Sequence, residues 1–420
     1  MRKICKKIIL IILRVLAVRR LAAQTQIIGI TGSVGKTTTK EALRQILKKD
    51  FRVVASPASY NSEFGVPLTI LAEQSGLASP GKWGGILWRG FRKSWQKLVA
   101  DFLILELGAE KPGDLMQLLK IVQPQIGITL AVAPVHLAQN RFPNLAAIAA
   151  EKSLLAQNLP SSGKAILNAD DERVRNFRSP AQTIFFSQNY QAAAAVPGTL
   201  YATKITENFK GISADILWNK QRAYLNLSIL GQHNLTAVLA ALATALAVGL
   251  NLKQACANLQ DFRLPPGRGN LFSGLKGSRI LDSSYNANPE STLATLKVLQ
   301  KLQITGRKIV VLGQMNELGQ NAERFHREIG AKAQEVADLV VGVFGAAKIL
   351  VESVRGKPAY FFADAISAAD FLRARLQPGD LILVKGSQNQ VRLEKLVLQL
   401  LANPRQDQKF LCRQGSEWQF

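Results

Sequence analysis

The stretch ITGSVGKTTTKEAL, at residues 30–43, restricts the fold of this chain more than any other. The apolar run TQIIGI before it is typical of a buried strand. After it, apolar residues recur at helical spacing at Ala42, Leu43, Ile46 and Leu47, which indicates a helix. A strand, a glycine-containing turn and a helix, in this order, form the context of a nucleotide-binding phosphate loop. An ordinary strand-to-helix turn is the alternative.

Lys36 and Thr37 give this loop the side chains that phosphate chemistry requires. Lys36 would place a positive charge near the β- and γ-phosphates, and the Thr37 hydroxyl could ligate Mg²⁺. Backbone N–H groups at the start of the helix would bind phosphate oxygens. The general pattern has a glycine six residues before the lysine, where this chain has Ile30. We predict that ATP binds to Gly32, Ser33, Val34, Gly35, Lys36, Thr37 and Thr38.

Strand-like and helical segments alternate along most of the chain. The first half contains the strand-like runs FRVVAS, DFLILEL, QIGITLAV, KAILNA and QTIFFS. This alternation predicts an α/β protein with a mostly parallel, doubly wound sheet. Residues 191–230 instead alternate polar and apolar positions between turn signals, which indicates a small antiparallel region.

The segment RLPPGRGNLF, at residues 263–272, has the composition of a linker. A second α/β unit follows it, with the strand-like runs SRILDSSY, KIVVLGQM, LVVGVF, AYFFA and DLILVKGS. We therefore expect a basic amphipathic helix at residues 1–24 and a central P-loop ATPase domain at 25–266, with an insertion at 74–100. A C-terminal Rossmann-like domain is expected at 267–420.

The charge of the chain is strongly unbalanced, with 53 basic and 29 acidic residues and a formal net charge of +24. Half of this excess lies in two short segments that contain no acidic residue. Residues 1–24 hold seven basic side chains, and residues 82–97 hold five. Such an excess indicates an anionic partner, which is a lipid surface, a nucleic acid or an anionic substrate.

The N-terminal segment MRKICKKIILIILRVLAVRRLAAQ has the character of an interfacial helix. It lacks the small-residue cleavage site of a secretory signal. Its apolar stretch at residues 8–18 is interrupted by Arg14 and is shorter than the about 20 residues that span a membrane. On a helix, its lysines and Arg14 fall on one side and its apolar residues cover the other. We predict contact with an anionic membrane surface, and the alternative is a helix docked on the protein itself.

The segment GKWGGILWRGFRKSWQKL, at residues 81–98, also mixes aromatic and basic residues, which suits a headgroup interface. Stacking on single-stranded nucleic acid is a weaker alternative, and nucleic acid is not expected as a partner, because no known binding module accompanies the segment. Cys5, Cys256 and Cys412 are far apart in the sequence and predict a reducing compartment without disulfides. The expected location is the cytoplasm, peripheral at the inner membrane face.

Several polar residues are expected at the carboxyl edges of the predicted sheets, where α/β proteins bind ligands. Glu106 ends a buried strand and could ligate Mg²⁺ across from Thr37, although a surface acid is the alternative. His136 follows the next strand at the same edge. Lys385 and Ser387 end the last strand. By contrast, Lys152 lies in a predicted helix, LAAIAAEKSLLAQ, at a position that reads as solvated.

Other candidates lie at helix starts and in the linker. Arg268, between two glycines, could move onto phosphates as the domains close. Asn234 opens an alanine-rich helix, where an ordinary N-cap would look the same. The run SYNANP contains Tyr285, Asn286 and Asn288, which supply planar and amide groups. This run also predicts a turn followed by a helix that starts with proline.

In their order along residues 27–395, the motifs of this chain resemble those of the Mur ligase family, the ATP-dependent amide-bond-forming enzymes of cell-wall precursor synthesis. The matching stretches are ITGSVGKTTTKE, YNSEFGVPLT, ELGAEKPGDL, PVHL, EKSLL, LNADD, GQHNLTAVLAA, PPGRG, DSSYNANPESTLATL, VVLGQMNELG, HREIG and GDLILVKGS. The phosphate loop of that family is similar to TGxxGKT, so Ile30 is no departure from it.

The resemblance implies an ATP-dependent ligase that uses two Mg²⁺ ions and acts as a monomer. It is closest to the branch that adds D-alanyl-D-alanine to a muramyl-peptide carboxylate through an acyl phosphate, in peptidoglycan precursor synthesis. The alternative is a membrane-associated enzyme of the same kind with a different acceptor, linked to a lipid or a polymer. A non-catalytic, membrane-bound nucleotide-binding scaffold is the alternative from another class.

The resemblance also assigns roles to residues. Lys36, Glu106, His136 and Lys152 would be catalytic, and the amine of Lys152 would become a carbamate. The metal ligands would be Thr37, Glu106, His136 and the Lys152 carbamate. Asn234 would lie near the adenine and Asp282 would contact the ribose, together with the nucleotide-binding residues Arg268, Tyr285 and Asn286. The substrate-binding residues would be Asn61, Tyr285, Asn288, Lys385 and Ser387, while Lys308 and His326 match motifs without an assigned role.

The chain also departs from the family pattern. The phosphate loop begins near residue 31, so we expect the usual N-terminal UDP-binding domain of the family to be missing. We therefore expect the enzyme to sit at the membrane and to use a lipid-linked or polymer-linked acceptor. Ala138 stands where an acid is expected near the metals, and Gln314 stands where the C-terminal site would have an aspartate.

Overall fold

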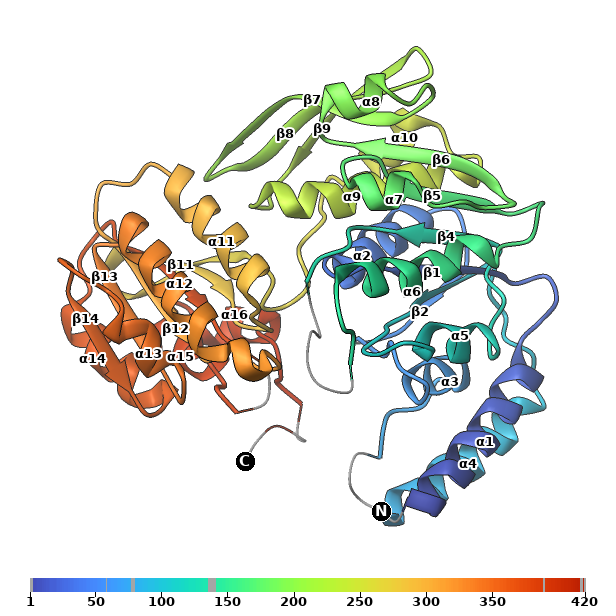
Figure 1. The fold of residues 1–420 in the computed structure, drawn as a ribbon, viewed down its shortest axis with the longest axis horizontal. Helices are drawn as coiled ribbons and strands as arrows, with labels where there is room; N and C mark the ends of the chain where they lie inside the picture. Colours follow the sequence, from blue (N-terminus) through green and yellow to red (C-terminus); the bar gives the residue numbers. More distant parts are fainter. Residues whose placement is uncertain are drawn as a thin grey trace.

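The computed structural model describes residues 3–57, 59–76, 80–134, 141–387, 390–415 and 418, and the side chains of Lys3 and Pro80 are not described. These residues form two α/β units, each built around its own sheet (Figure 1). The predicted α/β class with mostly parallel sheets is confirmed.

The first sheet has nine strands within the described residues, in the order β2-β3-β1-β4-β5-β6-β7-β8-β9. Its strands are β1 (Gln26–Thr31), β2 (Val53–Ala55), β3 (Phe102–Glu106), β4 (Ile126–Thr129), β5 (Lys164–Asn168), β6 (Gln182–Ser187), β7 (Leu200–Asn208), β8 (Gly211–Trp218) and β9 (Gln221–Leu227). In this order, neighbouring strands from β2 through β1 to β7 pair in parallel, and β8 pairs antiparallel with both β7 and β9. The antiparallel region is therefore an extension of the same sheet.

Helices cover both faces of this sheet. They are α1 (Lys3–Arg20), α2 (Lys36–Leu47), α3 (Gly65–Leu71), α4 (Pro80–Ser94), α5 (Asp114–Leu119), α6 (Leu145–Gln157), α7 (Glu172–Arg175), α8 (Tyr190–Ala194), α9 (Gln232–Ala247) and α10 (Leu252–Ala257). Successive residues of β1 face opposite cores: Ile28 and Ile30 pack with α2 and α9, and Ile27 packs with the helices of the other face. Strands buried on both sides explain the unbroken apolar runs.

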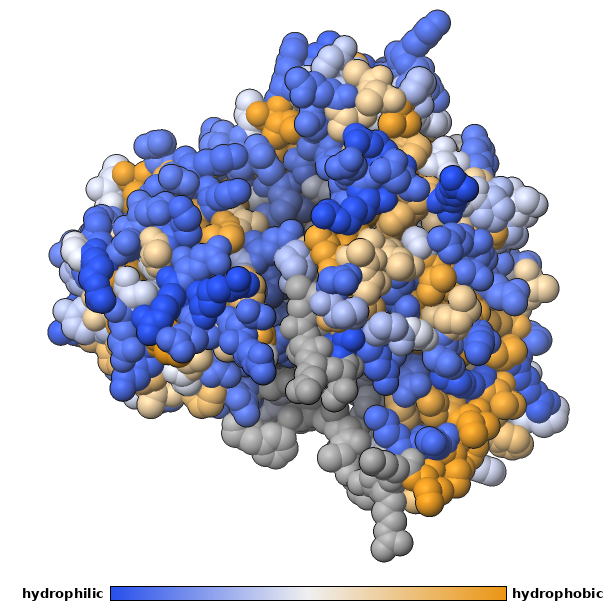
Figure 2. All heavy atoms as spheres, viewed as in Figure 1, coloured by the Kyte–Doolittle hydropathy of each residue, from blue (hydrophilic) through white to orange (hydrophobic). Residues whose placement is uncertain are grey.

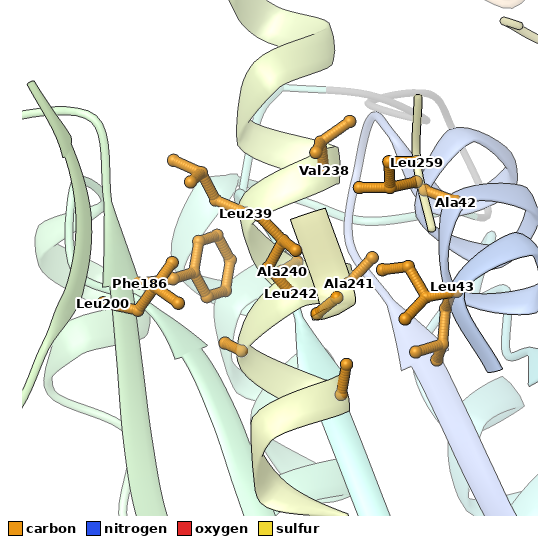
Figure 3. Packing of buried hydrophobic residues seen from close by; sticks show 14 of the residues in the cluster. Ala42, Leu43, Phe186, Leu200, Val238, Leu239, Ala240, Ala241, Leu242 and Leu259 are labelled. Atoms are coloured by element: carbon orange, nitrogen blue, oxygen red, sulfur yellow. The ribbon is translucent and has the colours of Figure 1, made fainter. Parts of the chain in front are cut away.

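The long helix α9 packs tightly because its sequence is rich in alanine. Figure 3 shows Leu239 directed toward Phe186 and Leu200 of the sheet, while Ala241 faces Leu43 of α2. Small side chains let two helices approach closely, and the packing in turn fixes the position of α2. The start of α2 carries the phosphate loop, so this core positions the site.

The second sheet has six strands in the described chain, in the order β10-β11-β15-β12-β13-β14. The strands are β10 (Asn270–Ser273), β11 (Arg279–Ser283), β12 (Lys308–Gly313), β13 (Leu339–Val343), β14 (Ala359–Phe362) and β15 (Leu381–Lys385). The helices are α11 (Pro289–Lys301), α12 (Ala322–Val336), α13 (Ala347–Glu352), α14 (Ala365–Arg375), α15 (Glu394–Leu400) and α16 (Pro404–Asp407), with 3₁₀ turns η1 (Leu275–Gly277), η2 (Gly319–Asn321) and η3 (Gln408–Phe410). The predicted linker at 263–272 is too long, because its last residues start β10, which pairs antiparallel with β11.

Helix α1 lies against α3 and α4 on the outside of the first unit (Figure 1). The sequence predicted a single apolar face for this helix, and that prediction is wrong. Leu13 and Ala17 are fully buried against the protein, whereas Ile8, Ile11 and Val15 are exposed on the opposite side. The helix is therefore docked on the protein and has a second apolar face. Within the described residues, no helix is long and apolar enough to cross a membrane.

The C-terminal segment is held by a buried ion pair. Arg413 donates two hydrogen bonds to the Glu394 carboxylate, at 3.0 and 2.8 Å, and further hydrogen bonds to the carbonyl oxygens of Ser284 and Tyr285. Burial raises the pKa of Glu394. The hydrogen bond and the charge of Arg413 lower it by more than burial raises it, so the pKa lies below the ordinary value.

We expect Arg413→Met to lower the free energy of unfolding by about 2 to 4 kcal/mol, because Glu394 would stay buried with a weaker partner. A carboxyl whose pKa is depressed by folding stabilises the protein above its unfolded pKa of about 4.3 and loses that contribution as the pH falls. Urea denaturation should therefore show a difference between wild type and variant that shrinks below this pH. Arg405→Met, at an exposed arginine of the same segment, is the control, and an equal loss in both variants would contradict the prediction.

Candidate active site

A cavity of about 630 Å³ lies between the two units and collects most of the predicted site residues. From the first unit it is lined by the phosphate loop, Asn61, Glu106, Lys152 and Asn234. From the linker and the second unit it is lined by Arg268, Tyr285, Asn286, Asn288 and Lys385. His136, together with the adjacent Ala138, lies outside the described residues.

The phosphate loop joins β1 to α2 through two glycines that no other residue would replace easily. Gly32 and Gly35 have φ angles of 144° and 90°, and a Cβ on Gly32 would lie 2.8 Å from the Cβ of Leu130. Such positive φ angles favour glycine. Helix α2 starts at Lys36, so its first N–H groups are left for an anion. The Lys36 ammonium donates to the carbonyl oxygen of Gly32 at 2.5 Å.

Side-chain oxygens gather directly beside this loop. The Thr37 hydroxyl donates to Glu106 Oε2 at 3.1 Å and lies 3.1 Å from the Ser59 hydroxyl. Glu106 is almost fully buried at the end of β3, and its Oε1 forms an ion pair with the buried Lys40 ammonium. Hard oxygen donors of this kind are the ligands that Mg²⁺ prefers. Thr37 and Glu106 therefore fit a magnesium ion.

Lys40 is a residue of this site that the sequence reasoning missed. Its side chain is fully buried, with its ammonium 3.2 Å from Glu106 Oε1 and 2.7 Å from the carbonyl oxygen of Ser56. Lys40 lies on the same face of α2 as Leu43 and Leu47, at i, i+3 and i+7. A lysine on the apolar face of a helix needs a buried anionic partner, and this was the available signal.

Lys152 is buried, although the sequence alone predicted a solvated position on its helix. Burial, with the nearby charge of Lys36, lowers its pKa to about 7, against the opposing effect of Glu151. Glu151 instead accepts hydrogen bonds from the backbone of Gly113 and Leu115. The neighbouring Glu151 carboxylate is thus occupied by backbone N–H groups. Near neutral pH the Lys152 amine is therefore uncharged in a substantial fraction of the molecules, unlike that of an ordinary lysine.

Arg268 connects the second unit to the phosphate loop. Its guanidinium donates to the Thr37 hydroxyl at 3.0 Å and lies 4.2 Å from the centre of the Tyr285 ring. The Tyr285 hydroxyl donates to Ser59 at 3.1 Å. Ser59, which the sequence reasoning also missed, thus contacts three candidate residues, Thr37, Tyr285 and, at 3.4 Å, Arg268. This arrangement places a fixed positive charge beside the loop that would hold the phosphates.

The nucleotide-binding candidates differ in exposure. Asn234 is not an N-cap, because α9 begins at Gln232 after Gly231, and its amide donates to the carbonyl oxygen of Leu230 at 2.8 Å. Burial, with the charge of Lys385, lowers the pKa of the neighbouring His233 to about 4, so this ring is neutral. Asp282 is fully buried and does not line the cavity. Burial raises its pKa to about 6, and its Oδ2 has no hydrogen-bond partner in the described region.

The substrate-binding candidates are partly structural. Lys385 is buried, donates to the carbonyl oxygen of Asn286 at 3.0 Å, and has its pKa lowered to about 7 by burial and by the charge of Arg268. Asn288 caps α11 in a capping box with Ser291, as the SYNANP turn predicted. Ser387 does not line the cavity, because it is buried and donates to the carbonyl oxygen of Ala287 at 3.0 Å.

Two further candidates of the second unit lie away from the cavity. Lys308 donates to the carbonyl oxygen of Gln300 at the protein surface. His326 is buried, accepts a hydrogen bond from the backbone N–H of Met315 at 3.0 Å, and lies 2.6 Å from the carbonyl oxygen of Ala322. The contacts of Lys308 and His326 are therefore those of structural residues.

Most of the chain matches known family models. Residues 30–79 and 90–245 match the Mur ligase middle domain, and residues 267–388 match the domain described as Mur ligase, glutamate ligase domain. The α1 helix and residues 80–89 of α4 lie outside these matches.

Curated relatives and solved structures agree with these matches. The chain is 33% identical over 386 residues to the UDP-N-acetylmuramoyl-tripeptide–D-alanyl-D-alanine ligase of Synechocystis, covering 90% of this chain and 75% of that protein. It is 32% identical over 400 residues to the ligase of the same name from Mycobacterium tuberculosis H37Rv, covering 88% and 72%. The structure of the MurF ligase of Thermotoga maritima in complex with ADP has a TM-score of 0.76 and 27% identity, covering 92% and 82%.

Proposed function

This chain belongs to the Mur ligase family, and we propose that it joins D-alanyl-D-alanine to the carboxylate of a muramyl peptide in an ATP-dependent reaction of peptidoglycan precursor synthesis. One observation carries this proposal. The phosphate loop, the Thr37–Glu106 pair, Arg268 and Lys152 line one cavity, beside groups of the second unit that suit a peptide substrate. The names of the relatives support the choice of acceptor and dipeptide.

The nucleotide is proposed to bind with its phosphates at the loop from Gly32 to Thr38. Asn234 would lie near the adenine, and Arg268, Tyr285 and Asn286 would contact the nucleotide. Asp282 would contact the ribose, and the unpaired Oδ2 of this buried residue is an acceptor that a ribose hydroxyl could satisfy. The ADP in the T. maritima structure supports ATP as the cosubstrate.

The first magnesium ion would be held by Thr37 and Glu106, whose oxygens already lie within 3.1 Å of each other. A second would be held by His136 and by Lys152 as a carbamate. An uncharged lysine amine is the form that adds to carbon dioxide, and the low pKa of Lys152 supports this modification. When bound, the two ions would neutralise charge on the phosphates and the attacking carboxylate.

The proposed reaction has two steps. The acceptor carboxylate attacks the γ-phosphate of ATP, and the bond from this phosphorus to the β-phosphate oxygen breaks. ADP is released, and the acceptor becomes an acyl phosphate. The amine of D-alanyl-D-alanine then attacks the acyl carbon, loses a proton and expels phosphate. Lys36 and Arg268 reduce the repulsion between the two anions in the first step. The acceptor and the dipeptide would be oriented by Asn61, Tyr285, Asn288 and Lys385. Ser387 would support the loop that contains Tyr285 and Asn288.

The functional unit is proposed to be a cytoplasmic monomer with a helix at residues 1–24, an ATPase domain at 25–266 and a C-terminal domain at 267–420. We also propose a peripheral position at the inner face of the membrane. The exposed apolar side of α1, beside basic residues, supports that position. It also favours a second candidate function, in which the acceptor is attached to a lipid or a polymer.

The decisive test is ATP turnover with D-alanyl-D-alanine and a panel of muramyl peptides, either UDP-linked or lipid-linked. Sustained ADP formation should require both the acceptor and the dipeptide, whereas the acceptor alone should give at most about one ADP per enzyme, and mass spectrometry should find the amide. A lipid-linked acceptor that outperforms the UDP-linked one would favour the second candidate. The absence of ADP with every acid and amine pair would overturn both.

A further inference from the structure

Helices α1 and α4 pack side by side and leave an apolar surface that no part of the described chain covers. We call this the docking surface. It comprises Ile4 (72% exposed), Ile8 (51%), Ile11 (60%), Val15 (62%), Val18 (50%), Trp88 (63%), Phe91 (42%) and Trp95 (63%). Figure 2 shows an orange band along the part of the molecule where Figure 1 places these two helices. A contiguous apolar patch on a polar protein marks an interaction site.

The side chains of the docking surface are arranged regularly on both helices. The exposed residues of α1 recur at i, i+4, i+7, i+11 and i+14, which is a straight stripe opposite the buried Leu13 and Ala17. The ring of Phe91 on α4 contacts those of Trp88 and of Trp95, which directly follows the helix, and each pair of ring centroids is 6.1 Å apart. The Arg19 guanidinium of α1 lies 3.5 Å from the centre of the Trp95 ring, which joins the two helices into one surface.

Basic side chains surround this surface, and neither helix contains an acidic residue. Some of the basic groups have internal partners, since Arg14 pairs with Glu63 and Arg89 and Lys93 pair with Glu73. Others are exposed: at helical spacing Lys7 and Arg19 flank the stripe of α1, and Arg92 flanks the aromatic residues of α4. A positive rim attracts anions and would make a second copy of the same surface repel the first.

We propose that the docking surface inserts into an anionic lipid surface. Both helices would lie in the plane of the interface, since no described helix can cross a bilayer. Exposed isoleucine and valine side chains would enter the acyl region, as in amphipathic interfacial helices. The tryptophans suit the headgroup level, and the basic rim suits anionic headgroups. A nucleic acid would not account for the aliphatic stripe, because it offers few apolar partners for it.

The docking surface adjoins the cavity described above through one short segment. Arg14 of α1 lies 3.4 Å from the carboxylate of Glu63, and Lys6 lies 5.4 Å from the centre of the Phe64 ring. Asn61, Ser62 and Glu63 of this segment line the cavity. Insertion would therefore hold the cavity close to the headgroups. This proposal does not depend on which reaction the cavity performs.

The test is flotation of the full chain with vesicles of phosphatidylcholine alone or of phosphatidylcholine with phosphatidylglycerol. The chain should float with the anionic vesicles, and added salt should weaken this binding. The triple variant Ile8→Ser, Ile11→Ser, Val15→Ser should bind at least about tenfold more weakly, because each apolar side chain contributes to insertion. The variant Tyr224→Ser, Ile366→Ser, which changes two exposed apolar residues elsewhere, should bind like wild type.

A melting curve and the ATP turnover of each variant show whether it is folded. Should the triple variant not fold, blue-shifted tryptophan fluorescence of the unmodified chain with anionic vesicles decides the same question. The proposal is overturned by a chain that floats with neither kind of vesicle or by a folded triple variant that floats as well as wild type. It is equally overturned by a dimer in solution that the triple variant abolishes, since the surface would then bind a second copy.

Discussion

Lys36→Ala is expected to reduce ATP-dependent ligation by about a thousandfold, as removal of a phosphate-stabilising charge does in other phosphoryl-transfer sites. Lys36 starts α2, and its ammonium lies at the phosphate loop, hydrogen-bonded to the carbonyl oxygen of Gly32. Alanine would leave the backbone N–H groups in place but remove the charge that offsets the approach of a carboxylate to the γ-phosphate. ADP formation in the presence of acceptor and dipeptide measures this effect.

The matched control for this variant is Lys49→Ala, which removes an exposed lysine just beyond the end of the same helix. It should retain nearly full activity and the same melting temperature. Phosphate release that is unchanged in Lys36→Ala would instead mean that the loop does not hold the reacting phosphate. The non-catalytic scaffold would then become the better description of the chain.

Lys152→Ala is expected to lower ligation by about a hundredfold or more, because the second metal would lose a ligand. The alanine variant should recover part of its activity when a short carboxylic acid is added, since the acid can occupy the place of the carbamate. A lysine that acts only through its positive charge would not be replaced by an anion. Lys120→Ala, at an exposed lysine, is the control and should need no such rescue.

The modification has a signature that does not depend on activity. With ¹³C-labelled bicarbonate, the wild-type spectrum should contain a carbamate carbonyl signal that Lys152→Ala lacks. The pKa of about 7 sets its pH dependence. The uncharged amine becomes more abundant as the pH rises through 7, so the signal should be weak below that pH and strong above it. An unchanged spectrum in the variant would contradict the carbamate.

The central fold and the phosphate loop were predictable from the sequence because their signals are local. The strand before Gly32 and the helix after Gly35 have their own apolar periods, and parallel strands buried on both faces give unbroken apolar runs. Motif order then identified the family, which the comparisons confirmed. The SYNANP turn was also predictable, because a proline that follows Asn288 fixes the helix start.

The remaining features depend on contacts that a single segment does not reveal. Lys152 reads as solvated within its helix, and only the surrounding tertiary structure buries it. Ser59 gained its importance from Thr37 and Tyr285, which lie far away in the sequence. The division of the α1 apolar residues into two faces likewise required the neighbouring helices α3 and α4.

The ion pair between Arg14 and Glu63 has a thermodynamic consequence. Arg14 belongs to the helix that we place on lipid, while Glu63 lines the cavity that we assign to the substrates. If displacement of Glu63 by a bound acceptor changed the affinity for the bilayer, the bilayer would by reciprocity change the affinity for the acceptor by the same factor. Binding of the enzyme to the membrane would then depend on whether the cavity holds an acceptor, and Glu63 would be the residue that couples the two.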